Sequence, residues 1–457
     1  MDAQPQILFT PPVPRPPDAP LPLRAFLRAI RENALTIWPE AAYRDEAMTR
    51  QFLGRTNVLL NAPDAIHHVL VDNHANYRRS AASIRILRPI TGQGLLLSMG
   101  EAWKLQRRTV APALAPRVMP LLCRHIVAAT VEALDSAGGA VDLLAFIQTL
   151  ALDIAGRSMF SLETRAHGPA MRRLLTEFAT HHARPHMLDM LLPPSIPTLR
   201  DWRRNQFSKR WMRLIETMME ARIANADHAS ATHDGPPRDL FDLLRAARDP
   251  ETGAGFTAPE LRDQVATLIL AGHETTAVTL FWACMLLARA PGIQAWLAEE
   301  LSGLDLATEN IQTRLIRTRA VVNETLRLFP AAFTLVRETI APDQAGEVNL
   351  PRGAVVMIAP WVLHRHHAFW TNPGAFDPGR FMPDAPAPPR FAFMPFGAGP
   401  RICVGAQFAM AEAVLVLAHL VQRFDIDLHD RRPILPVAVV TTQPDHAPIY
   451  TLTRRTR

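Results

Sequence analysis

The stretch Phe393-Met-Pro-Phe-Gly-Ala-Gly-Pro-Arg-Ile-Cys-Val-Gly405 decides the fold, because one of only three cysteines in the chain lies there among glycines and prolines. Glycine adopts backbone angles closed to other residues and proline fixes a bend, so such a loop can turn successive N–H groups towards one sulfur. Residues 406–421 are apolar at helical spacing. Cys403 therefore precedes a helix N-terminus, whose partial positive charge favours the thiolate, a ligand for a soft or borderline metal.

The pattern Phe396-Gly-x-Gly-x-Arg401-x-Cys403-x-Gly405 resembles the haem-binding loop of the cytochromes P-450. A single cysteine in a tight turn is more often a buried free thiol, but six fixed positions in ten residues favour a haem ligand. The resemblance implies haem b as cofactor, Cys403 as axial ligand of its iron, Arg401 on a haem propionate and Phe396 beside the sulfur. It also implies that Gly405 leaves room for the helix beside the ring. A thiolate on haem iron favours O–O cleavage.

Composition is that of a globular protein with a large core, with 48% hydrophobic and 20% charged residues among 457. The three cysteines, Cys123, Cys284 and Cys403, show no disulfide framework or paired metal spacing. This fits a reducing compartment, so we expect a cytoplasmic protein. The formal charge of +6 comes without a basic run of five or more. Nucleic-acid binding is therefore discounted, and an acidic protein partner is the better use of that charge.

The N-terminus, residues 1–22, is rich in proline. It lacks the charged region and apolar core of a signal peptide, and no apolar run there could span a bilayer. We expect a Pro-rich arm over residues 1–25 lying on the surface, followed by one catalytic unit over residues 26–457. A soluble monomer without a transmembrane segment is the expectation.

A long helix is predicted from the capping box Thr257-Ala-Pro-Glu260 to Ala290-Pro-Gly292. Its length is roughly 50 Å at 1.5 Å per residue. The centre is apolar enough to suggest a membrane span, but residues 273–276 (His-Glu-Thr-Thr) would be costly in lipid. A helix that is apolar nearly all round belongs in the core of a large protein.

Within this helix, Ala271-Gly-His-Glu-Thr275-Thr276 is a second chemical site. Gly272 costs roughly 1 kcal/mol against alanine in a helix, and the missing side chain makes room for a flat ligand or an oxygen molecule. A threonine hydroxyl can bond back one turn and loosen the helix, and a neighbouring carboxylate can relay protons. Alone, the motif could equally be a polar kink. It resembles the oxygen-activation site of the cytochromes P-450, which implies Thr275 as the alcohol, Glu274 as the acid and Ala271 beside the haem.

A helix opening at Gly100 carries Trp103 and Arg107 four residues apart on one face. Both are donors only, which suits a carboxylate, although such residues are most often surface or partner contacts. The resemblance implies that this pair, and Arg337 further on, contact the haem propionates. Lys104 and Arg108 fall on the neighbouring helix face, where a redox partner could dock, and Arg390 lies shortly before the ligand loop.

Glu324 and Arg327 are one helical turn apart and can pair. The default for such a spacing is an exposed pair worth under about 1 kcal/mol. In the cytochromes P-450 the matching pair is buried and joined by a downstream arginine, for which Arg380 is the candidate. Buried guanidinium and carboxylate groups must satisfy one another, so this set would be structural.

The substrate pocket is expected to include Leu96, Phe333, Ala271 and Thr275 by the same resemblance, although Leu96 could equally be ordinary core. Residues 187–197 form an apolar loop that is either a mobile lid over substrate or a simply packed loop. Residues 348–357 are typical of a β-hairpin, and residues 437–452 predict two short strands. The expected fold is mainly α: a large helical domain with a long central helix, plus a small β-sheet domain.

The resemblance implies a soluble bacterial haem-thiolate monooxygenase that inserts one oxygen atom of O2 into a hydrophobic substrate, fatty acid-like or terpenoid. Residues 249–253 and 271–276 look like the soluble bacterial fatty-acid hydroxylases. No Gly-x-Gly-x-x-Gly follows a strand, so electrons should come from a separate ferredoxin-like or flavoprotein donor. The alternatives are a peroxide-driven peroxygenase and a non-catalytic haem-thiolate sensor or carrier. Neither would need the acid–alcohol pair.

Overall fold

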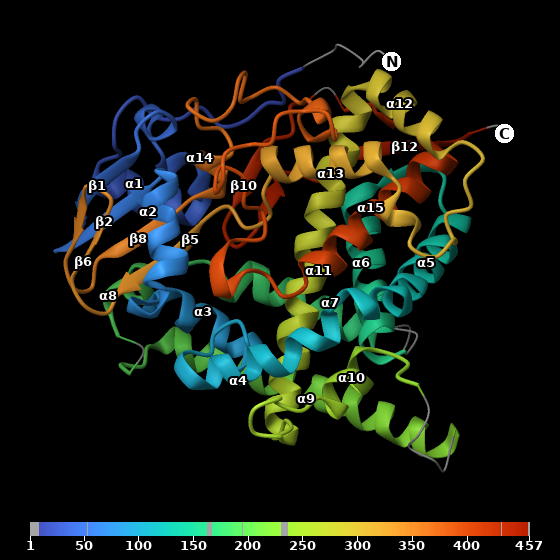
Figure 1. Cartoon of the computed structure of the whole chain (residues 1–457), viewed down its shortest axis with the longest axis horizontal. Helices are drawn as coiled ribbons and strands as arrows, with labels where there is room; N and C mark the ends of the chain where they lie inside the picture. Colours follow the sequence, from blue (N-terminus) through green and yellow to red (C-terminus); the bar gives the residue numbers. More distant parts are fainter. Residues whose placement is uncertain are drawn as a thin grey trace.

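The computed structural model describes residues 9–52, 54–161, 167–193, 195–229, 236–430 and 432–455. Helices form the larger part of the molecule and most strands gather at one side (Figure 1). The helices are α1 (Leu23–Glu32), α2 (Pro63–His67), α3 (Ala81–Thr91), α4 (Gly100–Val110), α5 (Met119–Asp135), α6 (Leu143–Phe160), α7 (Gly168–Glu177), α8 (Met187–Leu191), α9 (Leu199–Ala229), α10 (Leu240–Ala246), α11 (Ala258–Arg289), α12 (Pro291–Leu301), α13 (Ile316–Leu328), α14 (Pro360–Leu363) and α15 (Ala406–Arg423).

The central element is the 32-residue helix α11, which runs through the middle of the helical part (Figure 1). It begins at the predicted capping box, because the Thr257 amide and hydroxyl both donate to Glu260, at 2.9 and 2.7 Å. The helix packs against α6, α15 and α13. By length and composition, α6, α11 and the bent pair 100–114 with 116–135 could each cross a membrane. In α11, 67% of the apolar window is buried inside the protein, so its apolar surface serves the core.

Twelve strands occur in the described part of the chain and form a five-stranded sheet in the order β1-β2-β8-β5-β3, a three-stranded sheet β4-β12-β9, and the pairs β6-β7 and β10-β11. In the larger sheet β2 and β8 are parallel, with Val58 opposite Val356. The strands are β1 (Ala47–Phe52), β2 (Arg55–Leu60), β3 (Tyr77–Arg79), β4 (Gly139–Asp142), β5 (Leu335–Thr339), β6 (Asp343–Ala345), β7 (Val348–Leu350), β8 (Val355–Ile358), β9 (Phe424–Leu428), β10 (Pro436–Ala438), β11 (Thr442–Pro444) and β12 (Ile449–Arg454).

Two strand predictions were wrong. Residues 348–357 do not form a hairpin with each other. Strand β7 pairs with the preceding strand β6, and β8 pairs with β2 and β5. The tight turn is at Gly346, whose φ of +60° suits glycine, and it precedes the Pro-x-Gly turn that suggested the hairpin. Residues 437–452 contribute to three strands rather than two, since β12 separately joins the sheet with β4 and β9.

The N-terminal arm is attached to the body of the protein at several points in its described part. The Phe9 ring lies 5.9 Å from that of Phe376, and the Phe376 amide donates to the Phe9 carbonyl at 2.9 Å. Further along, the Glu40 amide donates to the Pro17 carbonyl. Helix α1 begins at Leu23, inside the range predicted for the arm. Residues 1–8 lie outside the described residues.

Candidate functional site

The cysteine loop wraps tightly before α15, for which Gly405 is the N-cap residue. The Cys403 amide donates to the Phe396 carbonyl at 2.9 Å, which closes the loop on itself. Gly399 is required by the packing, because a Cβ there would stand 2.0 Å from the Leu70 carbonyl oxygen, and its φ is +71°. The loop therefore holds Cys403, which is exposed, at a fixed place beside α15.

Three influences act on the Cys403 thiol. Desolvation by the surrounding protein raises its pKa, while the Gly405 amide and the charge of Arg107 oppose the shift. Arg107 is brought there by its own hydrogen bond, from Nη1 to the Ile402 carbonyl at 2.8 Å. A metal would replace the thiol proton, as thiolate ligation requires.

An uncompensated group of arginines lies nearby. Arg79 and Arg337 stand directly opposite each other on β3 and β5, and like charges so placed repel. Burial, then Arg337 and Arg401, lower the pKa of Arg79 to about 9. Burial and Arg337 lower that of Arg401 to about 10. Arg79 Nε and Arg401 Nη1 are buried without a hydrogen-bond partner.

Within the described residues no carboxylate pairs with these three arginines, so the cluster calls for an anionic ligand. Trp103 belongs to it, because the Arg401 guanidinium lies 4.4 Å from the centre of its ring. Arg79 escaped the sequence analysis because it belongs to no motif. The sequence shows only that Arg79 follows another arginine, Arg78. The β3–β5 register is what places Arg79 opposite Arg337.

On α11, the Thr275 hydroxyl donates to the Ala271 carbonyl at 2.6 Å. Ala271 is exposed in mid-helix, whereas Ile269 and His273, two residues to either side, are buried. No heavy atom outside the local helix lies within 4 Å of where a Cβ on Gly272 would stand. The face of α11 that carries Ala271 and Thr275 is therefore left open, as a flat ligand requires.

Glu274 is hydrogen-bonded to the hairpin formed by β10 and β11 near the C-terminus, here called the C-terminal hairpin. Its Oε1 accepts a hydrogen bond from Thr441 Oγ1 at 2.9 Å and another from Gln443 Nε2. Burial raises the pKa of Glu274, and these two bonds oppose the shift. Thr441 and Gln443 are functional candidates that the sequence analysis missed, because nothing local links them to a residue some 167 positions away.

The two motifs are joined through α11 and α15. Thr276 faces Glu412, whose pKa burial raises well above its usual range while Thr276 opposes the shift. Glu412 lies on α15, the helix that follows the Cys403 loop, and Thr276 follows Thr275 on α11. Helices α11 and α15 pack directly against each other, so the cysteine loop and the acid–alcohol pair belong to adjoining helices, whereas Thr276 Oγ1 and Glu412 Oε1 are both buried without a hydrogen-bond partner among the described residues. An isolated acid in an otherwise apolar helix was the only sequence signal for Glu412.

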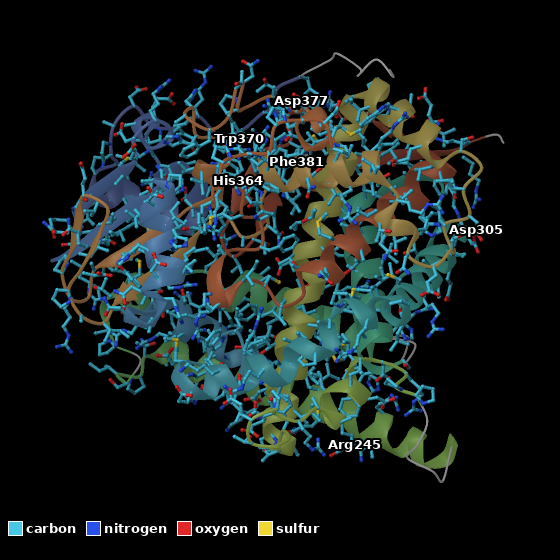
Figure 2. The ribbon with its side chains drawn as sticks, viewed as in Figure 1. Arg245, Asp305, His364, Trp370, Asp377 and Phe381 are labelled. Atoms are coloured by element: carbon cyan, nitrogen blue, oxygen red, sulfur yellow. The ribbon has the colours of Figure 1, made fainter. Side chains whose placement is uncertain are left out.

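The Glu324–Arg327 pair is fully buried on α13, with both contacts at 2.7 Å. Arg380 completes the set at 3.7 Å from Glu324. The Asp377 amide also donates to Glu324, at 2.8 Å, and the Arg327 guanidinium lies 5.0 Å from the centre of the Trp370 ring. Figure 2 labels Asp377 and Trp370, which both lie in the upper part of the molecule. These contacts tie α13 to the coil that precedes the cysteine loop.

Of the predicted pocket residues, Leu96 is half-buried and Phe333 is 6% exposed, within the core. The predicted loop over residues 187–197 contains helix α8, and residue 194 lies outside the described residues. Buried Arg85 holds this segment by donating to the carbonyls of Pro193 and Ile196, at 2.6 and 2.9 Å. The pocket and lid roles stay predictions.

The two positive charges on α4 that were predicted to face a redox partner both have acidic neighbours, and their docking role stays a prediction. Arg108 is paired with Asp249 at 2.8 Å and with Glu251 at 3.1 Å. Lys104 is paired with Glu101 at 2.7 Å. Acidic neighbours therefore compensate both charges. Only the Glu101–Lys104 pair could be predicted from spacing within one helix. Arg390 is exposed, with its guanidinium 5.1 Å from the centre of the Phe391 ring.

Comparison with known proteins agrees with this arrangement. The family model described as Cytochrome P450 matches residues 14–447. Cyclooctatin synthase of Streptomyces melanosporofaciens is 33% identical over 370 residues, covering 79% of each chain. Protein LUTEIN DEFICIENT 5, chloroplastic, of Arabidopsis thaliana is 30% identical over 439 residues, covering 88% of this chain and 70% of its own. The chain belongs to the cytochrome P450 family.

Two further comparisons extend this result. Cyclooctat-9-en-7-ol 5-monooxygenase of Streptomyces melanosporofaciens is 30% identical over 346 residues, covering 74% of this chain and 73% of its own. The crystal structure of the cytochrome P450DA heme domain superimposes with a TM-score of 0.79 at 23% identity, over 96% of this chain and 98% of the other. The predicted fold, the haem cofactor and a monooxygenase activity are thereby confirmed.

Proposed function

We propose that Cys403 is the axial ligand of the haem iron and that the protein hydroxylates a hydrophobic terpenoid-like substrate. The observation that carries this proposal is that an exposed cysteine lies near an arginine cluster for which the described residues supply no carboxylate partner. Arg79, Arg337 and Arg401 would hold the two haem propionates, with Trp103 packed beneath Arg401. Bound haem supplies the activation of O2; the protein supplies the ligand, the pocket and the path for protons.

Glu274 and Thr275 are proposed as the proton-handling residues. The Thr275 hydroxyl now donates to Ala271, one turn back, and can rotate to serve the open side of α11. Glu274 is held at one place by Thr441 and Gln443, so its carboxyl is positioned rather than free to sample several rotamers. A positioned acid transfers protons more efficiently than one that must be oriented first.

The substrate class rests on two terpenoid-related relatives, named Cyclooctatin synthase and Cyclooctat-9-en-7-ol 5-monooxygenase, which are 33% and 30% identical to this chain. This favours a terpenoid over the fatty-acid class that the short motif in α11 resembled. For electrons we propose a separate donor protein. The docking residues predicted on α4 are already paired, so Arg390 is the better candidate for a contact. The free cysteines of the described part accord with a cytoplasmic location, which we also propose.

The ligand assignment is tested by spectroscopy. Reduced protein with carbon monoxide should absorb at the thiolate-specific position, and Cys403→Ser should lose that band. Cys123→Ser is the matched control, because Cys123 is a free cysteine on α5 and should leave the band unchanged. Retention of the thiolate band in the Cys403 variant would exclude the assignment.

The substrate class is tested separately, by titrating oxidised protein with diterpene alcohols and with fatty acids of matched size. We expect the optical shift that marks loss of iron-bound water with the terpenoids at lower concentration. Tighter binding of the fatty acids would reverse the assignment. Product formation with hydrogen peroxide alone, and none with reduced donor proteins, would instead favour the peroxygenase alternative.

A further inference from the structure

A hollow of about 510 Å³ lies between the N-terminal arm and the body of the protein, and is called the arm hollow here. The arm is fastened before it, where the Phe376 amide donates to the Phe9 carbonyl, and after it, at the Pro17 carbonyl. The arm's side of the wall consists of Thr10, Val13, Pro14 and Pro16. The opposite wall includes Tyr43, Trp361, Arg365 and residues 372–375. A hollow of this volume can accept a small organic molecule.

Arg365 is a buried cation on the wall of the arm hollow, with 6% of its surface exposed. Its guanidinium lies 3.7 Å from the centre of the Trp361 ring and donates to the carbonyls of Trp361, at 3.3 Å, and Leu328. Within the described residues no carboxylate forms an ion pair with Arg365, and Glu324, which acts on it electrostatically, is already bonded to Arg327. A buried charge without a counter-charge is costly, so this site favours an anion.

Arg365 and Tyr43 have hydrogen-bond donors to offer a ligand. A guanidinium carries five N–H groups, and among the described residues carbonyls engage two of those on Arg365. Burial lowers the pKa of Arg365 to about 9, with Tyr43 and Glu324 opposing the shift, so the group stays charged at neutral pH. The Tyr43 hydroxyl accepts from Trp361 Nε1 at 3.1 Å, and its own proton has no acceptor in the described part of the chain. Burial raises the pKa of Tyr43 to about 12, so that proton is retained.

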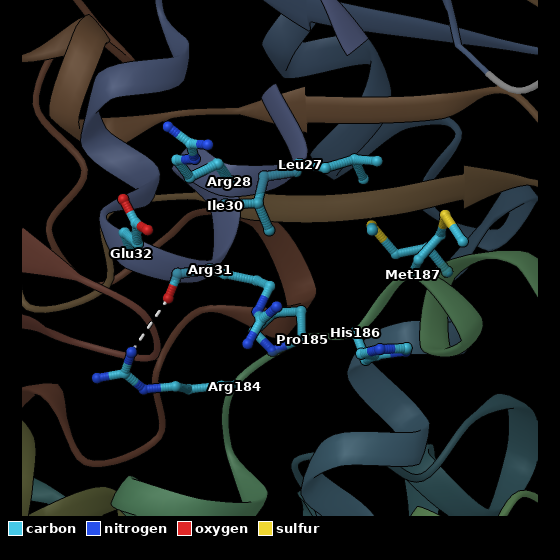
Figure 3. A pocket seen from close by; sticks show the side chains of 10 residues that line it. Leu27, Arg28, Ile30, Arg31, Glu32, Arg184, Pro185, His186 and Met187 are labelled. Atoms are coloured by element: carbon cyan, nitrogen blue, oxygen red, sulfur yellow. Dashed lines mark hydrogen bonds between the residues drawn. The ribbon is translucent and has the colours of Figure 1, made fainter. Parts of the chain in front are cut away.

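Two other hollows show why the burial of Arg365 matters. Figure 3 shows one of about 520 Å³ between α1 and residues 184–190. Its arginines are exposed, so water solvates their charges: Arg28, Arg31 and Arg184. The other, of about 440 Å³, contains buried Arg204, which Asp189 matches at 2.7 Å. Of the arginines that line these three hollows, Arg365 is the one that is both buried and without a paired carboxylate among the described residues.

We propose that the arm hollow binds a small organic carboxylate, with Arg365 and Tyr43 as its hydrogen-bond donors. A carboxylate has the planar pair of oxygens that a guanidinium fork recognises, and Trp361 and the prolines of the arm would pack against the rest of the molecule. One buried cation matches a monoanion, whereas a phosphate dianion would keep an unpaired charge. Glu40 also lines the arm hollow, but its carboxylate is paired with Arg44 at 2.7 Å. The proposal does not depend on the haem site.

The test is ligand-observed fluorine NMR of the full-length haem protein with fluorobenzoate, and with fluorobenzamide as the uncharged analogue of similar shape. We expect fluorobenzoate to bind at least roughly ten-fold more tightly, because it makes charge-assisted hydrogen bonds that the amide does not. Inorganic phosphate should not compete. Val13→Glu places a carboxylate of the arm itself at the hollow and should abolish fluorobenzoate binding. Val13→Gln, which has the same size without the charge, should retain it.

Arg365→Lys keeps the charge but loses the fork, so fluorobenzoate should bind roughly ten-fold more weakly. The matched control is Arg28→Lys, at an exposed arginine of the hollow in Figure 3, which should leave binding unchanged. The carbon monoxide spectrum of every variant checks folding, and if Arg365→Lys does not fold, the two Val13 variants decide. Equal binding of the two probes, no binding of fluorobenzoate, or equal effects of Val13→Glu and Val13→Gln overturns the proposal. Binding that shifts the haem spectrum and persists in Val13→Glu would place the probe at the haem and also overturn it.

Discussion

Replacing Arg327 by lysine should remove a large share of the stability, although the charge is kept. The Arg327 guanidinium makes five hydrogen bonds: two to Glu324, both at 2.7 Å, and three to the carbonyls of His364, Pro373 and Ala375, at 2.9, 2.6 and 2.8 Å. An ammonium has three donors, so at least two bonds are lost. At about 1.5–3 kcal/mol for each charged hydrogen bond, the loss is about 3–6 kcal/mol. Typical domains have about 5–15 kcal/mol in total.

The assay is urea unfolding of Arg327→Lys, followed by circular dichroism and by haem absorbance so that coincidence of the two is checked. The matched control is Arg210→Lys. Arg210 also makes a two-pronged contact with a glutamate, Glu177, but its side chain is 53% exposed. There the loss should stay under about 1 kcal/mol. Equal losses in the two variants would refute the reasoning that burial, rather than the ion pair itself, sets the magnitude.

Three further predictions follow from the site. His273 is buried and its pKa is lowered to about 4 by burial. The unfolded chain takes up that proton near pH 6.5, so His273 contributes about 3 kcal/mol at neutral pH that is lost as pH falls from about 6.5 to about 4; His273→Gln should flatten this slope in urea unfolding. Thr275→Ala should keep substrate binding but lower product per electron roughly 10²-fold, with peroxide released, and an unchanged yield per electron would remove Thr275 from the proton path. Gln443→Leu removes a bond that lowers the pKa of Glu274, so the pH profile of product per electron should move upwards; an unmoved profile would exclude this positioning role.

The long elements and the short motifs were predictable because their signals are local. The capping box at Thr257 and the apolar run after it define α11. The Glu324–Arg327 pair follows from helical spacing alone. That it is buried follows from the resemblance, since spacing is the same for exposed pairs.

What escaped the sequence depends on strand register and on contacts distant in the chain. Arg79 gains its meaning only opposite Arg337, and Glu274 meets Gln443 only through the C-terminal hairpin. Strand β8, which follows Gly353, was predicted to pair with β7 because Pro-x-Gly353 is a turn signal. It pairs instead with β5, and the hairpin turn of β7 is at Gly346. The ion pair between Arg108 and Asp249 was likewise not predictable, because the two residues belong to segments far apart in the chain.

The facing arginines of β3 and β5 have a consequence for how the protein matures. Arg79 and Arg337 repel each other across a strand pairing of only three residues. This repulsion destabilises the β3–β5 pairing, and a negative charge bound between the two arginines would relieve it. If these arginines hold the haem propionates as we propose, cofactor binding would also supply the counter-charge for the β3–β5 edge. Protein made without added haem should then be cleaved at β3 more readily than the haem-loaded protein in limited proteolysis, because a bound partner stabilises the folded state.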